Sequence, residues 1–128
     1  MTSIFAVSEA HFQFQVVEYL NAVLPVGCVF HHSPNEGRRH VAYKVKLKKS
    51  GTQAGWPALE IFVPSEFSTS GSPRSIFLEL KTKKGRISEM QKIRRDELLA
   101  AGCEWNLCRS LDDVEQFLDE LIHLKVTK

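Results

Sequence analysis

Two charged residues stand two positions apart inside an otherwise apolar run. Residues 75–82 read Ser-Ile-Phe-Leu-Glu-Leu-Lys-Thr, which is typical of a buried strand that carries Glu79 and Lys81. Side chains at i and i+2 point to the same side of a strand, so this carboxylate and this ammonium face one place. Buried charges are unfavourable unless they are paired or bind something. The pair suits metal-dependent phosphodiester hydrolysis, in which the carboxylate holds a divalent cation and the ammonium lies near the attacking water. A salt bridge at a sheet edge is the alternative.

The composition is that of a small globular domain. The chain has 128 residues, of which 43% are hydrophobic and 25% charged, so we expect a single domain over residues 1–128. No apolar run approaches the roughly 20 residues of a membrane span, and residues 1–10 lack the layout of a signal peptide. Three cysteines are too few and too scattered for a disulfide scaffold or a zinc site. These features favour free thiols in the cytoplasm.

Basic residues gather in two blocks. One lies within residues 38–49, and the other lies within residues 81–95, directly after Glu79. Acidic residues collect instead over residues 112–120. The net charge of +2 is small, so the uneven distribution, rather than the total, points to a polyanion partner.

Helical and extended patterns alternate along the chain. Apolar residues at helical spacing predict helices over residues 8–22, 88–101 and 110–124. Short apolar runs predict strands over residues 27–30, 58–63, 75–82 and 104–108. Residues 38–49 are ambiguous, because their alternation favours a strand while their length without Gly or Pro allows a helix. Residues 64–74 are rich in Ser, Gly and Pro and predict a mobile connection between two antiparallel strands. Together these elements predict a mixed sheet flanked by helices in one α/β domain.

Four ordered segments carry a family resemblance. They are residues 32–39 (His-Ser-Pro-Asn-Glu-Gly-Arg-Arg), 55–62 (Gly-Trp-Pro-Ala-Leu-Glu-Ile-Phe), 77–81 (Phe-Leu-Glu-Leu-Lys) and 88–91 (Ser-Glu-Met-Gln). Their order resembles that of VRR-NUC nucleases, which are members of the PD-(D/E)xK superfamily, and the resemblance extends from about residue 9 to residue 118. It implies a restriction-endonuclease-like core with a helix over residues 38–49. It also implies a phage or bacterial homodimer that cuts branched DNA such as four-way junctions.

The resemblance also implies roles for individual residues. Glu79 and the backbone carbonyl of Leu80 would hold Mg²⁺, or Mn²⁺ in its place, and Glu9 would reach the water shell of the ion. Lys81 would orient the attacking water, and Gln91 would contact Lys81 or a phosphate. We expect phosphate contacts, which give affinity without sequence preference, from Asn35, Arg38, Arg39, Lys83, Lys84 and Arg86.

Several of these residues have a structural alternative. Glu9 also suits the first turn of a helix, where it complements the helix dipole. Gln91 also completes a capping box with Ser88, which would turn its side chain back to the backbone. Trp56 either stacks on a base or is packed in the protein. Of the neighbours His31 and His32, we expect one to be packed and one to be solvated.

One departure from the family pattern bears on activity. The family motif is Gly-x-Pro-Asp, and this chain has Ala58 where the metal-binding Asp is expected. Glu60 lies about 6.6 Å further along the strand, which is far for a ligand sphere of about 2.0–2.1 Å. We therefore expect this chain to be inactive, through a substitution made for structural work or, alternatively, as a natural nucleic-acid-binding module that has lost catalysis. A scaffold whose basic face binds an acidic protein is the third interpretation.

Overall fold

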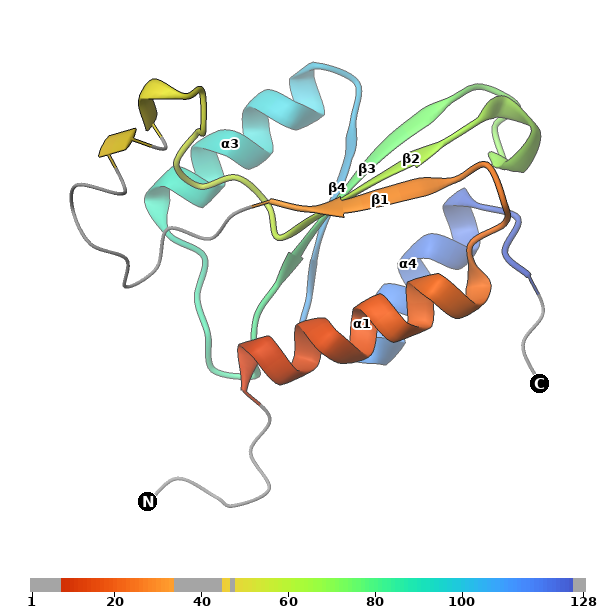
Figure 1. The fold of residues 1–128 in the computed structure, drawn as a ribbon, viewed down its shortest axis with the longest axis horizontal. Helices are drawn as coiled ribbons and strands as arrows, with labels where there is room; N and C mark the ends of the chain where they lie inside the picture. Colours follow the sequence, from red (N-terminus) through yellow and green to blue (C-terminus); the bar gives the residue numbers. More distant parts are fainter. Residues whose placement is uncertain (1–7, 34–44, 47, 126–128) are drawn as a thin grey trace.

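A mixed four-stranded sheet forms the centre of the molecule (Figure 1). The computed structural model describes residues 8–33, 45, 46 and 48–125. The strands are β1 (Val29–His32), β2 (Leu59–Val63), β3 (Arg74–Leu80) and β4 (Glu104–Cys108), and they lie side by side in that order. β1, β2 and β3 pair antiparallel, whereas β4 runs parallel to β3. A helix joins β3 to β4, as a parallel connection requires.

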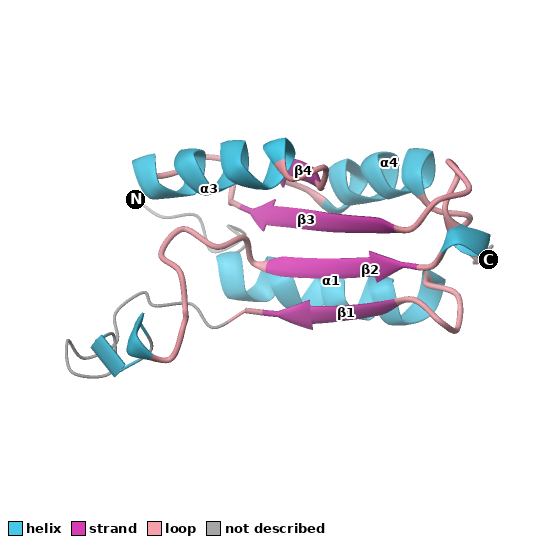
Figure 2. Ribbon diagram, turned by 90° about the horizontal axis from the view of Figure 1, so that it is seen from above, coloured by secondary structure: helices cyan, strands magenta, loops and turns pink. Residues whose placement is uncertain are grey.

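Helices cover both faces of the sheet (Figures 1 and 2). α1 (Glu9–Val23) and α4 (Leu111–Leu121) lie on one face, and α3 (Glu89–Ala100) lies on the other. Alternate residues of β2 and β3 point toward α1 and α4 and form the core with the apolar stripes of these helices. The fully buried members from the two strands are Leu59, Ile61, Ile76, Leu78 and Leu80. None of the helices in the described ranges is long and apolar enough to cross a membrane.

Local sequence sets the helix boundaries. Ser8, Ser88 and Ser110 cap the three helices, since each side chain accepts a hydrogen bond from a backbone N–H in the first turn. α3 ends before Gly102, whose φ of +87° is the left-handed conformation of a helix C′ position. α4 ends at Leu121, earlier than predicted, because Ile122 becomes extended and pairs with Ser68.

Two connections differ from the patterns read in the sequence. Residues 64–74 join the antiparallel strands β2 and β3 as predicted, but the prediction that this segment is mobile finds no support. It contains a 3₁₀ turn, η1 (Ser65–Phe67), and backbone hydrogen bonds tie it to the end of α4. Within residues 38–49, the described residues 45, 46, 48 and 49 are helical, as the family resemblance implied and against the alternation. Residues 38–44 and 47 lie outside the described ranges.

Candidate active site

The start of β2 and the end of β3 bring position 58 next to Glu79. Leu59 pairs with Leu78 in the antiparallel register, so the preceding residue, Ala58, stands opposite Glu79. Residues directly opposite in an antiparallel pair share one face, with Cβ atoms about 4.5–5.5 Å apart. A side chain at position 58 therefore lies beside the Glu79 carboxylate, as the interpretation of this pair as a metal site requires.

Glu79 is buried without full hydrogen bonding. It is 4% exposed, and its Oε2 atom is the buried side-chain oxygen or nitrogen that lacks a partner within the described ranges. Burial raises the pKa of this carboxyl from 4.5 to about 7, the nearby Lys81 ammonium opposes the rise, and the Glu9 carboxylate adds to it. A buried acid with an unpartnered oxygen is characteristic of a functional site.

Lys81 lies immediately beyond β3, on the side of the strand that Glu79 faces. The two side chains are close enough for the ammonium to lower the pKa of the Glu79 carboxyl, yet no ion pair joins these two described residues. β3 lies between β2 and β4, so the alternative interpretation, a salt bridge at a sheet edge, is excluded.

Glu9 and Leu80 lie at the same end of the sheet. Glu9 begins α1, and its negative charge raises the pKa of Glu79. Its position in the first turn also suits the helix dipole, so the two interpretations of Glu9 are compatible. Leu80 ends β3 with its side chain buried in the core, which leaves its backbone as the part available to a metal.

The loop that precedes position 58 is fixed on the first turns of α3. A Cβ atom on Gly55 would lie 2.5 Å from the carbonyl group of Met90, and the φ of Gly55 is +75°. Only glycine allows such an approach in this conformation. Arg94 donates to the carbonyl oxygen of Ala54 from Nε at 3.2 Å and from a terminal nitrogen at 3.0 Å. Both contacts hold the backbone that leads into position 58.

Gln91 forms the capping box. Its Oε1 atom accepts a hydrogen bond from the backbone N–H of Ser88 at 2.7 Å, and its own N–H donates to the Ser88 hydroxyl at 3.1 Å. The side-chain oxygen of Gln91 is therefore occupied at the helix terminus. The prediction that Gln91 contacts Lys81 or a phosphate finds no support for this atom. The reason is local, because a capping Gln folds back on the turn that contains it.

Glu60 and Trp56 engage each other. The Trp56 indole donates to Glu60 at 3.3 Å, and its ring packs edge-on against Phe77. Packing is thus the role that this structure gives Trp56. Glu60 shares the face of Ala58 but is already hydrogen-bonded, which agrees with the prediction that it does not replace the missing Asp.

Sequence reasoning missed a contact from β1. Both His31 and His32 are exposed, so the prediction that one is packed is wrong. The Nδ1 atom of His32 donates to the carbonyl oxygen of Ala58 at 2.9 Å, and the backbone N–H of Ser33 reaches the same oxygen at 3.3 Å. The end of β1 thus fixes the backbone at position 58. No local pattern predicts a contact across 26 residues.

The predicted DNA-binding residues fall into two groups. Lys83, Lys84 and Arg86 are exposed in the segment that follows β3, next to Glu79 and Lys81. Asn35, Arg38 and Arg39 lie outside the described ranges.

The donors that surround Glu79 fit a divalent cation incompletely. Mg²⁺ favours carboxylate and carbonyl oxygens and commonly uses one or two carboxylates, and Glu79 offers an unpartnered oxygen. However, no group of three or more His, Cys, Asp or Glu side chains that could hold a metal occurs among the residues described. Ala58 provides no side-chain oxygen at the position where the register would place a further ligand.

Comparison with known proteins identifies the fold. A solved structure named VRR_NUC domain protein matches with a TM-score of 0.64 and 19% identity, over 91% of this chain and 89% of that chain. The chain has a VRR-NUC fold. The restriction-endonuclease-like architecture predicted from the sequence is thereby confirmed. No protein-family model matches the sequence, and no curated protein matches it.

Proposed function

We propose that this chain derives from a metal-dependent, structure-selective endonuclease that hydrolyses phosphodiester bonds in branched DNA, and that Ala58 leaves it inactive. The observation that carries the proposal is the unpartnered Oε2 of buried Glu79, opposite position 58 and close to Lys81. The VRR-NUC fold and the exposed basic residues after β3 support it.

The proposed roles follow from position. Glu79, the Leu80 carbonyl and an Asp at position 58 would hold Mg²⁺ or Mn²⁺, with Glu9 at its water shell. The ion would supply a Lewis acid and a lowered pKa for bound water. Lys81 would orient the attacking water and stabilise the negative charge that develops on the phosphate. Lys83, Lys84 and Arg86 would contact DNA phosphates without reading bases.

A natural nucleic-acid-binding module of the same fold is the second candidate. The absence of a three-residue ligand group among the described side chains favours it. It keeps the basic surface and needs no metal, so it differs from the first proposal in its response to a restored ligand.

Ala58→Asp tests the two proposals against each other. Outer-shell partners of a metal already contribute about 10–100-fold, so restoring a direct ligand is expected to raise four-way-junction cleavage by at least about 100-fold with Mg²⁺ or Mn²⁺. Ala58→Asn is the matched control, because it has the same shape without the charge. If folded Ala58→Asp protein cuts neither linear nor branched DNA with either ion, the enzyme proposal is wrong.

The same preparations test the proposed partners. Phosphate contacts release counterions, so binding to four-way DNA should weaken steeply as salt rises; binding that does not depend on salt would favour an acidic protein partner. We also propose a homodimer, because a four-way junction offers paired scissile sites related by a two-fold axis. A monomer mass in light scattering would contradict it.

A further inference from the structure

Arg109 reaches the segment that follows the candidate catalytic strand. The two N–H groups of one terminal nitrogen of its guanidinium donate to three backbone carbonyl oxygens, with one N–H shared: those of Thr82 at 2.7 Å, Lys83 at 3.2 Å and Gly85 at 2.6 Å. A single cation that collects three carbonyls within four residues fixes the course of that turn. The charge assists each of these hydrogen bonds.

The backbone of Arg109 is itself held by a hydrogen bond to α4. Its backbone N–H donates to the Asp113 carboxylate at 2.8 Å, within the first turn of α4. The residue before it, Cys108, ends β4 and accepts a hydrogen bond from the N–H of Lys81 at 3.1 Å. The Arg109 side chain thus projects from a hydrogen-bonded junction between β4 and α4, beside the end of β3.

The turn that Arg109 holds packs on the side chain of Lys81. A Cβ atom added to Gly85 would lie 3.3 Å from Cδ and 3.4 Å from Cβ of Lys81. The Gly85 backbone therefore borders the aliphatic stem of Lys81, and a displaced turn would leave that stem free to move. A 1 Å misplacement of a catalytic group is enough to lower a rate by about 100-fold.

We propose that Arg109 is a positioning residue that sets the orientation of Lys81 through the turn at Gly85. The catalytic part of this proposal rests on the proposed function. The structural part does not, because the contacts of Arg109 exist in the present chain. In this proposal, the Lys81 ammonium stays oriented only while the carbonyl oxygens of the turn remain hydrogen-bonded to the Arg109 guanidinium.

Two substitutions separate geometry from charge. Arg109→Lys keeps the positive charge but lacks the planar guanidinium, and Arg109→Gln removes the charge. In the present chain, both should shift the NMR signal of the Lys81 side chain and speed hydrogen exchange at the Gly85 amide, which donates to Thr82 at 3.1 Å. Lys125→Gln removes one positive charge elsewhere and should leave both signals unchanged.

A third substitution approaches Lys81 from the other side. Gly85→Ala adds a methyl group against the stem of Lys81 and leaves Arg109 in place, so it should shift the Lys81 signal even if the Arg109 variants fail to fold. If Arg109→Lys or Gly85→Ala leaves the Lys81 signal unchanged, the positioning role is wrong.

The Ala58→Asp background adds the catalytic readout. There, Arg109→Lys should lower kcat for junction cleavage by at least about tenfold and change DNA affinity by less than about threefold. A kcat that does not change would overturn the catalytic part. If Ala58→Asp itself is inactive, the proposed function fails, while the Lys81 and Gly85 signals still decide the positioning role.

Discussion

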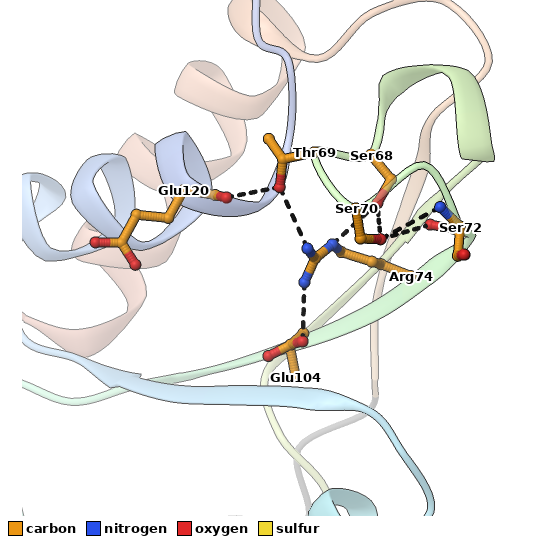
Figure 3. A network of polar contacts seen from close by, with 7 residues as sticks. All are labelled: Ser68, Thr69, Ser70, Ser72, Arg74, Glu104 and Glu120. Carbon is orange, nitrogen blue, oxygen red and sulfur yellow. Dashed lines mark hydrogen bonds and ion pairs between the residues drawn. The ribbon is translucent and has the colours of Figure 1, made fainter.

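The charged side chains at the two ends of β3 differ in how fully they are hydrogen-bonded. At the amino end, the Arg74 guanidinium donates to Ser68 at 2.9 Å, to Thr69 at 3.2 Å and to Glu104 at 2.9 Å (Figure 3). At the carboxyl end, Glu79 is buried with one oxygen unpartnered. The same strand thus carries a satisfied ion at one end and an unsatisfied one at the other.

This difference separates a structural network from a candidate functional site. The Arg74 network ties the β2–β3 connection to β4 and, through the Thr69 hydroxyl on the carbonyl of Glu120 at 2.7 Å, to α4. Its hydrogen bonds offset the desolvation of the guanidinium. At Glu79 the desolvation is not offset, and the carboxyl responds with a raised pKa. This uncompensated acid at the end of a strand is the feature on which the proposed metal site rests.

The largest effect on stability is expected from Glu79→Gln. Because the folded pKa of about 7 exceeds the ordinary 4.5, the folded state binds a proton that the unfolded state has lost between these values. The contribution of protonated Glu79 to the free energy of unfolding is therefore fully present below pH 4.5. It is lost as the pH rises from 4.5 through 7. One pKa unit corresponds to about 1.4 kcal/mol, so the ionised carboxylate destabilises the fold by about 3 kcal/mol.

Urea unfolding at pH 4 and pH 8 measures this effect. Glu79→Gln should match the parent at pH 4, where the acid is neutral, and exceed it by about 3 kcal/mol at pH 8. Equal stabilities of Glu79→Gln and the parent at pH 8 would mean that the carboxylate is compensated.

Arg74→Met should produce a smaller loss that does not depend on pH. Removing the guanidinium deletes three hydrogen bonds, and the partly exposed pair with Glu104 counts for little. We expect a loss of about 2 kcal/mol at both pH 4.5 and pH 8. Lys92→Met, which breaks an exposed pair with Glu89, should cost less than about 0.5 kcal/mol. If Arg74→Met lost stability only above pH 7, the pH dependence would no longer distinguish the Arg74 end of β3 from the Glu79 end.

The order and types of the elements were predictable, because they follow from hydrophobic period. The alternation of Ile76, Leu78 and Leu80 with Phe77 and Glu79 assigned each residue of β3 to a face, and the structure agrees. The bounds of β4 match the prediction as well. The antiparallel pairing of β2 with β3 was predicted from the connection between them. The register that sets Ala58 opposite Glu79 was anticipated only through the family resemblance, since alternation does not specify register.

The contacts that fix the site were not predictable. Arg94 bonds to Ala54 across 40 residues, and Arg109 bonds to the turn at Gly85 across 24. Such contacts depend on tertiary packing, and the sequence around an Arg gives no sign of a partner that lies far along the chain. The Ser-rich connection was correctly predicted as a loop from its composition, but the hydrogen bonds by which Arg74 holds that loop were not predictable for the same reason.

Among Glu79, Arg74 and Gln91, the smallest expected effect on stability is that of Gln91, whose substitution distinguishes a role in the capping box from a role in phosphate binding. If the side chain serves the capping box alone, Gln91→Ala should destabilise the fold by about 1 kcal/mol and, in the Ala58→Asp background, change junction cleavage by less than about threefold. Gln91→Glu keeps a residue that completes the box, so it should retain stability. Because it also introduces a negative charge, it would repel a phosphate bound at this position. A large loss of cleavage in Gln91→Glu with unchanged stability would therefore assign Gln91 to substrate binding, and its capping bond would have to break when DNA binds.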